Sequence, residues 1–491
     1  MRKIRLFLGF FLSMLLIICF ARRVNDDVWI YERIEREYCT CEAIPRPSNE
    51  LLDFSEDAIT VLNFVESSHP MFTIEGWVPS LFWEARAEYI QTTSELLTVT
   101  DFALATQRVL ATLPDGHISR SFLLPIVWEW DYELENLNRI DEFFQDGGFV
   151  ETPFRARPYG IFLADEYNRI TNYRVISIGG VAIENITYQV DRYFGAYNIP
   201  GRLRNHARYS GYELMLQRAG ADIFFINDCP VVIMELENNR RYFRREVLLI
   251  ATHPSDDRIN LEPPFLQYQH LEDKNVFYIW FGSLQSCPHN HRTVKQSINR
   301  AMREGVRDFI FDLRDSPGGN PTIVNDLLEA LGLTIPSHGK ILRLSEWNES
   351  RSYTYFEGLI FPYFMHLNYR EGQEIYIVPS NLYNSNPNDV FIIALTSERT
   401  FSGGTIAALT IGDSDFGIII GEPSAGGANG IGWGTSFSPP TARLLIRSHI
   451  TMYFRPDQSR DPLVAEPDIH VNDWEALDVA LEFLRVRQSA Y

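Results

Sequence analysis

One hydroxyl group in the chain lies where the nucleophile of a hydrolase could lie. Ser402 is part of RTFSGGTIAAL (399–409), after the apolar run VFIIALTSE (390–398) and before a helix-forming segment. A serine before a helix often caps it, because its side-chain oxygen accepts a hydrogen bond from a free backbone N–H of the first turn. The same position suits a nucleophile, since the positive helix start stabilises developing negative charge. Locally the cap is the favoured interpretation, so the rest of the chain has to decide.

A histidine and a glycine turn elsewhere in the chain could complete such a site. His117 stands at the mouth of a Pro-Asp-Gly-His turn, and a neutral imidazole readily accepts a serine proton near pH 7. The apolar segment RDFIFDLR (307–314) runs into a turn with Gly318 and Gly319, which expose backbone N–H donors suited to an oxyanion. Taken singly, each is more often structural: a solvated histidine, or an ordinary strand-to-helix turn.

Two further clusters of residues could suggest nucleotide binding or a zinc site, but neither is well supported. GEPSAGG (421–427) lacks the Lys-Ser/Thr ending of a phosphate-binding loop, so nucleotide binding has little support. Cys287, His289 and His291 are three potential zinc ligands, but a zinc site needs suitable geometry and usually a further ligand from elsewhere. A solvated loop is the favoured interpretation there, and we expect no metal.

The composition indicates a large, acidic, globular chain. Its 491 residues are 45% hydrophobic, which predicts roughly two to four domains with well-filled cores. Lys and Arg total 44 against 64 Asp and Glu, a net charge of -20 that argues against a nucleic-acid partner.

The N-terminus has the layout of an export signal. Arg2, Lys3 and Arg5 precede the apolar stretch 6–21, which is shorter than the ~20 residues of a membrane span. We expect residues 1–24 to be a signal peptide or an uncleaved signal anchor, the latter being the one membrane attachment expected. The body would then be extracytoplasmic, in the cell envelope or periplasm or secreted. The four cysteines beyond the signal are too few in so long a chain to indicate a disulfide scaffold.

The hydrophobic pattern changes twice along the chain. Three-and-four spacing predicts helices over 51–68, 80–97 and 100–113. Shorter β-like segments follow, including a hairpin around Gly179 and Gly180. From residue 275 strands and helices alternate, which predicts an α/β domain with a central sheet.

Together these pieces resemble the tail-specific, or C-terminal processing, serine peptidase family. The matching segments, in the order found in the family, are DLRDSPGG (312–319), TFSGGTIAAL (400–409), GEPSAGG (421–427) and EPDIHV (466–471). The resemblance extends from about His117 to the C-terminus and is weakest in the middle. It implies an α/β fold in three parts beyond the signal: an N-terminal helical region carrying the base (25–154), a degenerate PDZ-like β-rich module (155–265) and a ClpP/crotonase-like sheet-and-helix catalytic domain (270–491).

The resemblance also implies roles. Ser402 matches the nucleophile, and the backbone N–H of Gly403, with one from Gly318 or Gly319, matches the oxyanion hole. Members with a Ser/Lys dyad carry a lysine where this chain has Gly427. The likeness is therefore to the histidine-dependent branch related to the tricorn core protease, in which a DGH-type turn supplies the base.

In that branch a hydroxyl residue precedes the histidine and contacts a distant glutamate. Here Gly116 precedes His117, so that relay is broken or rerouted. The place of the glutamate falls near Asp461, with Glu466 and Asp468 close by, and Asp461 is the candidate for an orienting carboxylate. For all three acids the favoured interpretation is nevertheless a polar loop or a strand end without a catalytic role.

The resemblance implies an exported serine endopeptidase that cleaves polypeptides without a metal or organic cofactor. The β-rich module has no clear carboxylate-binding loop such as GLGF, so general peptide cleavage is expected ahead of C-terminal recognition. The alternative is a catalytically impaired member that binds a peptide or lipophilic ligand, suggested by the missing lysine and hydroxyl. An acyl-CoA-handling role is disfavoured by the upstream helical and PDZ-like parts. The sequence predicts neither the substrate nor the oligomeric state.

Overall fold

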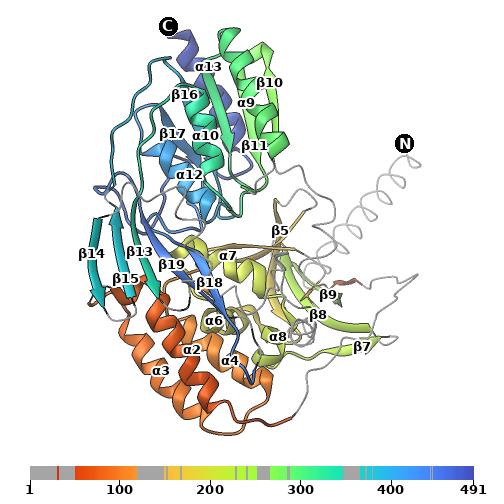
Figure 1. Ribbon diagram of the computed structural model, residues 1–491. Helices are drawn as coiled ribbons and strands as arrows, with labels where there is room; N and C mark the ends of the chain where they lie inside the picture. Colours follow the sequence, from red (N-terminus) through yellow and green to blue (C-terminus); the bar gives the residue numbers. More distant parts are fainter. Residues whose placement is uncertain are drawn as a thin grey trace, which may run out of the picture. The chain divides into compact units, whose positions relative to one another are not determined.

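A six-stranded sheet forms the centre of the region that carries Ser402 in the computed structural model (Figure 1). Its order is β10-β11-β12-β16-β17-β20, and every neighbouring pair is parallel except β10 with β11. The strands are β10 (Leu266–Leu271), β11 (Val276–Phe281), β12 (Asp308–Asp312), β16 (Phe391–Thr396), β17 (Gly417–Gly421) and β20 (Ile469–His470).

The structure describes residues 30–32, 50–73, 75–118, 149–150, 153–165, 169–226, 229–238, 241–250, 266–284, 288–345, 347, 365–370, 373–378, 380–442, 444 and 446–490. The signal expected at 1–24 and Cys287 lie outside these residues. No helix within these ranges is long and apolar enough to cross a membrane.

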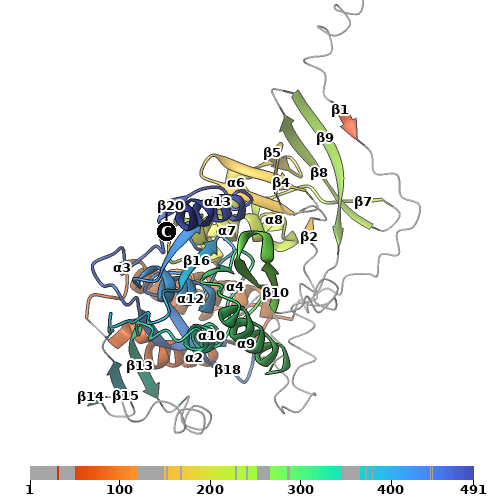
Figure 2. The same cartoon turned by 90° about the horizontal axis from the view of Figure 1, so that it is seen from above.

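Helices cover both faces of this sheet, which explains why its strands read as continuous apolar runs. Phe309 and Phe311 of β12 face one core, while Ile310 between them faces the other. The first core is closed by α9 (Pro288–Arg303), α10 (Thr322–Ala330) and α12 (Gly403–Gly412), and the second by α13 (Ala476–Ser489). Helices α9 and α10 lie side by side in both views (Figure 1, Figure 2). The α/β alternation predicted from residue 275 is confirmed.

A second, antiparallel sheet packs on the N-terminal helices. Its order is β14-β15-β13-β19-β18, formed by β14 (Met365–Arg370), β15 (Gln373–Val378), β13 (Gly339–Ser345), β19 (Ile446–Phe454) and β18 (Ile431–Phe437). The helices are α2 (Ser55–Ser68), the short η1 (Pro70–Thr73), α3 (Ser80–Thr93) and α4 (Val99–Leu110). Phe64 of α2 and Phe102 of α4 share one core with Ile446 of β19.

The three predicted helices are confirmed, with shorter ends. Leu52 and Leu97, expected at helix ends, instead pair with each other in a β-bridge. Helix α4 begins after Thr98, whose hydroxyl accepts a hydrogen bond from the Asp101 N–H at 3.1 Å. A backbone pairing and a side-chain cap therefore set boundaries that apolar spacing does not reveal.

The chain divides into two compact units. One comprises Pro45–Asp146, Asp191–Asn205 and Thr252–Tyr491, and it contains both sheets described above. The other comprises Met1–Ile44, Gly147–Val190 and His206–Ala251. The PDZ-like assignment of 155–265 stays a prediction.

The second unit is built on a sheet of order β1-β9-β8-β5-β4-β3, with β2, β6 and β7 at its sides. These strands are β1 (Ile30–Glu32), β2 (Phe149–Val150), β3 (Phe154–Arg157), β4 (Gly160–Ala164), β5 (Ile170–Ile178), β6 (Val181–Ala182), β7 (Phe224–Ile226), β8 (Cys229–Asn238) and β9 (Arg241–Ile250). Its remaining helical segments belong to α6 (Ile183–Tyr193), α7 (Ile199–Tyr209) and α8 (Glu213–Ala219). The hairpin predicted around Gly179 and Gly180 is confirmed between β5 and β6, and both glycines have positive φ.

Candidate active site

Ser402 lies at a strained turn between β16 and α12. Its φ of 52° and ψ of -124° are uncommon for a residue with a side chain, and such strain is concentrated at functional sites. Although Ser402 is the residue before α12, its side chain makes no capping hydrogen bond. Its Oγ instead lies 2.8 Å from Nε2 of His117. Ser402 therefore occupies the capping position, but its hydroxyl contacts His117 and does not cap the helix.

His117 is held in a turn that follows α4. Its backbone N–H donates to Oδ1 of Asp115 at 2.8 Å, and its side chain is 17% exposed. The imidazole packs against the Phe401 ring with 4.7 Å between ring centroids. A Cβ on Gly116 would lie 3.2 Å from two carbons of the same Phe401 ring. Glycine at 116 therefore allows the turn that carries His117 to pack closely against Phe401.

Asp115 is fully buried and accepts hydrogen bonds from four donors. Its Oδ1 accepts from the His117 backbone N–H and from the Tyr197 hydroxyl, at 2.8 and 2.7 Å. Its Oδ2 accepts from Nε2 of His69 at 3.2 Å and from Nδ1 of His449 at 3.1 Å. Burial alone would raise the pKa of this carboxyl, but attraction to His449 and the surrounding hydrogen bonds hold the pKa well below its usual range. Asp115 is therefore a buried carboxylate.

The donor role of His69 follows from its second nitrogen. Nδ1 of His69 accepts the backbone N–H of Met71 at 3.4 Å, which leaves the proton on Nε2, facing Asp115. Burial lowers the pKa of His69 and outweighs the opposing effect of Asp115. His69 thus donates to Asp115 as a neutral imidazole. Among the described residues, no group of three or more His, Cys, Asp or Glu side chains is arranged to hold a metal ion.

Tyr197 links the imidazole to the buried carboxylate. Its hydroxyl oxygen lies 3.0 Å from Nδ1 of His117 and also accepts the backbone N–H of Ile431 at 3.0 Å. The same hydroxyl donates to Asp115, so the hydrogen-bonded series runs from Ser402 through His117 and Tyr197 to Asp115. Nδ1 of His117 also lies 3.4 Å from Oδ1 of Asp115, within range of direct electrostatic attraction.

The ring of Tyr197 occupies the space next to Gly427. A Cβ on Gly427 would lie 3.1 Å from two carbons of this ring. A side chain at 427, such as the lysine of the dyad members, would therefore press on the Tyr197 ring and require that ring to shift. The absence of a lysine at 427 therefore leaves room for the Tyr197 ring beside the site.

Two backbone segments bring possible oxyanion donors to Ser402. The N–H of Gly403 is the first of helix α12 and has no acceptor within the helix. A Cβ on Gly318 would lie 2.6 Å from Cβ of Ser402 and 2.9 Å from N of Gly403, so the Gly318–Gly319 turn runs directly against the serine. Leu284 fixes this turn by donating its N–H to the carbonyl of Gly318 at 2.8 Å. The structure brings the predicted residues together here.

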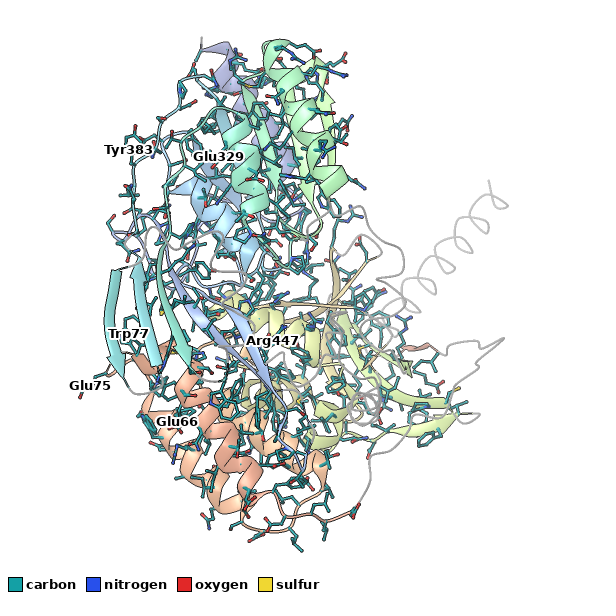
Figure 3. The ribbon with its side chains drawn as sticks, in the orientation of Figure 1. Glu66, Glu75, Trp77, Glu329, Tyr383 and Arg447 are labelled. Atoms are coloured by element: carbon teal, nitrogen blue, oxygen red, sulfur yellow. The ribbon has the colours of Figure 1, made fainter. Side chains whose placement is uncertain are left out.

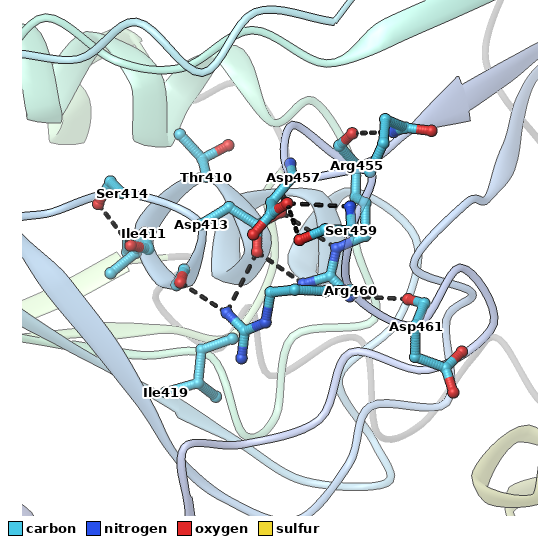
Figure 4. Close-up of polar contacts among 12 residues, drawn as sticks. Thr410, Ile411, Asp413, Ser414, Ile419, Arg455, Asp457, Ser459, Arg460 and Asp461 are labelled. Carbon is cyan, nitrogen blue, oxygen red and sulfur yellow. Dashed lines mark hydrogen bonds and ion pairs between the residues drawn. The ribbon is translucent and has the colours of Figure 1, made fainter.

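Asp461 stabilises its own loop. Its Oδ1 accepts the backbone N–H groups of Leu463 and Val464, at 2.7 and 3.1 Å. Its carbonyl oxygen accepts from Arg455, which forms an ion pair with Asp413 (Figure 4). In Figure 4 the Asp461 carboxylate points away from that ion pair. The predicted contact between Asp461 and His117 is not part of this arrangement.

The two acidic neighbours of Asp461 also have partners of their own. Glu466 lies 3.1 Å from Nε2 of His470, and Asp468 accepts the backbone N–H of Ile419 at 2.8 Å. The carboxylate beside His117 is Asp115, two residues earlier in the motif that predicted the histidine. Sequence reasoning treated Asp115 as a turn residue, and no local signal distinguished Tyr197.

Residues 275–471 match the model of Peptidase family S41. Among solved structures, mature CPAF is similar at a TM-score of 0.56 and 11% identity, with 88% of this chain and 95% of that chain covered. Mature CPAF complexed with lactacystin is similar at a TM-score of 0.54 and 11% identity, with 88% and 97% covered. A comparison with curated proteins finds no match.

The structural likeness concerns the fold, and the family match concerns the segment that holds Ser402 and the Gly318–Gly319 turn. Both agree with the order of motifs along the chain. The segment 275–471 thus matches peptidase family S41, the tail-specific serine peptidases, and this match indicates a serine-type hydrolase.

Proposed function

We propose that the chain is an exported serine endopeptidase in which Ser402 is the nucleophile and His117 the general base. The observation that carries this proposal is the 2.8 Å distance between Ser402 Oγ and His117 Nε2, residues that are 285 positions apart in the chain. A nucleophile and base within hydrogen-bond reach, with the base oriented by a third group, is the arrangement that acyl transfer requires.

The reaction follows from these positions. Nε2 of His117 takes the proton of Ser402 as Oγ bonds to the peptide carbonyl carbon, and the carbonyl oxygen becomes an oxyanion. The N–H of Gly403 and one from Gly318 or Gly319 stabilise that charge. His117 then gives its proton to the leaving amine as the C–N bond breaks. Water repeats the sequence on the acyl-enzyme and releases the carboxylic acid.

Tyr197 and Asp115 take the orienting role in this proposal. When His117 becomes imidazolium, its Nδ1–H donates to Tyr197, which donates to Asp115. The lowered pKa of Asp115 keeps it charged at the moment when the imidazolium forms. Gly116 lacks the hydroxyl of the histidine-dependent branch, and the relay is rerouted through the tyrosine.

Export and a polypeptide substrate complete the proposal. The basic residues before the apolar stretch 6–21 support export. Cys229 is disulfide-bonded, which supports an oxidising compartment outside the cytoplasm. The match of residues 275–471 to Peptidase family S41 supports cleavage of peptide bonds.

The test is covalent labelling with a fluorophosphonate, which reacts with activated serines. We expect labelling of the wild type, none of Ser402→Ala, and a much slower reaction of His117→Ala. Ser414→Ala, at the end of the same helix segment, is the matched control and should label at the wild-type rate. Equal labelling of Ser402→Ala and the wild type would remove the nucleophile from the proposal, and an undiminished rate in His117→Ala would remove the base.

A further inference from the structure

His449 contacts both the proposed base and the carboxylate behind it. Its Nδ1 lies 3.1 Å from Oδ2 of Asp115, and the centroid of its ring lies 5.0 Å from that of the His117 ring. It belongs to β19, a strand paired with β13 on one side and β18 on the other, and its side chain is 4% exposed. Figure 3 labels Arg447, two residues before His449, which locates this part of β19. A buried residue in the interior of the antiparallel sheet therefore reaches the turn that carries His117.

The ring nitrogens that face Asp115 assign a proton to each supporting histidine. A carboxylate only accepts hydrogen bonds, so Nδ1 of His449 and Nε2 of His69 both carry a proton. Both donate to the same oxygen, Oδ2, at 3.1 and 3.2 Å. The two histidines therefore use different ring nitrogens for the same task, a difference that substitutions can test.

The two oxygens of Asp115 serve different partners. Oδ2 accepts from the two histidines, whereas Oδ1 accepts from the Tyr197 hydroxyl and lies 3.4 Å from Nδ1 of His117. Because a carboxylate is planar, the direction of Oδ2 fixes the direction of Oδ1. The hydrogen bond from His449 therefore helps to decide where the negative charge lies relative to the His117 imidazole.

His449 also affects how strongly Asp115 attracts a proton on His117. Burial raises the pKa of Asp115, and attraction to His449 is the largest of the influences that lower it. A hydrogen bond donated to Oδ2 stabilises negative charge on that oxygen and leaves less of it on Oδ1. Protonated His117 is then stabilised less, and the neutral imidazole that can accept the serine proton is favoured. Loss of the His449 donor should therefore make His117 harder to deprotonate.

The titratable and charged groups near this cluster come from several elements. They are Asp115 and His117 in the turn after α4, His69 before η1, Tyr197 before α7, Arg343 on β13 and Arg447 on β19, while β18 presents Gly434 opposite His449. Arg343 donates to the carbonyl oxygen of His69 at 3.1 Å. Burial, and to a smaller extent the charges of His449 and Arg343, lower the pKa of His69. Both arginines keep their charge at every pH of an assay, so they add no pH dependence.

We propose that His449 is a positioning residue of the active site, whose Nδ1–H holds Asp115 in the orientation in which Oδ1 faces Tyr197 and His117. His69 supports the same carboxylate oxygen as a second donor. This inference rests on the proposed roles of Ser402 and His117. In this role His449 acts through Asp115 and not on the substrate, so it sets the rate of the chemical step and the pH at which the base becomes active.

The test compares amide side chains that reproduce one ring nitrogen or the other. The amide nitrogen of Asn can take the place of Nδ1 of a histidine, and that of Gln the place of Nε2. The measurement is the rate at which a fluorophosphonate labels Ser402. We expect His449→Leu to react about tenfold to hundredfold more slowly than the wild type, as for a lost hydrogen bond to a charged group. His449→Asn should stay within about threefold of the wild type, while His449→Gln should resemble His449→Leu.

The pH dependence of labelling separates positioning from general damage to the fold. In the wild type the rate rises with pH as His117 loses its proton. The midpoint of this rise should lie roughly 0.5–1 pH unit higher in His449→Leu and be unchanged in His449→Asn. On a peptide substrate, His449→Leu should lower kcat and leave KM unchanged. A purely structural loss reduces the active fraction equally at every pH and leaves the midpoint in place.

His69 provides the converse comparison, and Thr451 provides the control. Since His69 donates through Nε2, His69→Gln should label faster than His69→Asn. Thr451 is a buried residue two positions after His449 on β19, and its hydroxyl has no hydrogen-bond partner among the described residues. Thr451→Val should therefore keep the wild-type rate and midpoint. An equal loss in Thr451→Val would contradict the assignment to His449.

Two results would overturn the inference and leave the proposed function intact. One is a wild-type rate and midpoint in His449→Leu, and the other is an equal loss in His449→Asn and His449→Leu. If thermal unfolding shows that His449→Leu does not fold, the comparison of His449→Asn with His449→Gln decides, and equal rates in these two count against the role of Nδ1. No labelling of Ser402 in the wild type would overturn both the inference and the proposed function.

Discussion

The substitution Tyr197→Phe removes a single oxygen from the proposed relay and leaves the ring in place. That oxygen lies 3.0 Å from Nδ1 of His117 and 2.7 Å from Oδ1 of Asp115. In the variant, Oδ1 of Asp115 remains 3.4 Å from Nδ1, beyond good hydrogen-bond length but within electrostatic range. The Nδ1–H therefore loses a hydrogen bond while keeping much of the attraction to the carboxylate.

The expected loss of activity follows from the role of the hydrogen bond between His117 and Tyr197. A hydrogen bond to a charged group contributes about 1.5–3 kcal/mol, and His117 is charged only as the reaction proceeds. We therefore expect kcat/KM to fall about 10- to 150-fold in Tyr197→Phe. Asp115→Asn removes the charge and replaces one acceptor oxygen with an NH₂ donor, and it should lose about 10³- to 10⁴-fold.

The assay is the rate of Ser402 labelling by a fluorophosphonate, together with kcat/KM on a peptide substrate and thermal unfolding as a check on folding. Tyr193→Phe, in the same chain segment, is the control and should keep the wild-type rate. Wild-type activity in Tyr197→Phe would refute the relay. A loss as large as that of Asp115→Asn would show that the direct attraction between Asp115 and His117 contributes nothing.

Three further predictions concern packing and pH. Gly427→Ala places a Cβ 3.1 Å from the ring of Tyr197, so the ring must shift, serine labelling should slow by about tenfold, and the free energy of unfolding should fall by about 1–3 kcal/mol. An unaffected labelling rate would mean that Tyr197 adjusts freely. Burial lowers the pKa of His338 to about 4, from the value of about 6.5 that it has in the unfolded chain. Between these two pH values the unfolded state therefore binds more protons than the folded state, and acid favours unfolding. The free energy of unfolding should therefore drop by about 3 kcal/mol between pH 7 and pH 4 through this group, and urea titrations of His338→Gln should show a smaller drop than those of the wild type. Asp57 is buried and accepts the backbone N–H of Ala442, so Asp57→Ala should cost about 1–3 kcal/mol in urea unfolding, and a cost near zero would mean that water replaces the carboxylate.

The sequence predicted the parts of the site that follow from local pattern. Ser402 and His117 each occupy a motif whose neighbours have a fixed relation to them in the chain. Strand alternation after residue 275 predicted the sheet that positions the serine. These features depend on residues close in sequence, where periodicity and turn chemistry are informative.

Tyr197 could not be predicted in the same way. Its role depends on contacts with His117 and with Ile431, 80 and 234 positions away in the chain. Gly427 carried the one available signal: a position without a side chain next to the site implies that something else fills the space. Asp461 was a candidate orienting carboxylate because of its position relative to the family. In the structure its carboxylate accepts the backbone N–H groups of Leu463 and Val464.

The separation of these residues along the chain also bears on when the site can assemble during synthesis. Asp115 is 334 positions from His449, and both belong to the hydrogen-bonded cluster behind the base. A growing chain that has not reached β19 contains His117 and, late in synthesis, Ser402, but it lacks the strand that holds the cluster together. The hydrogen-bonded cluster around His117 can therefore assemble only after nearly the whole polypeptide has been made.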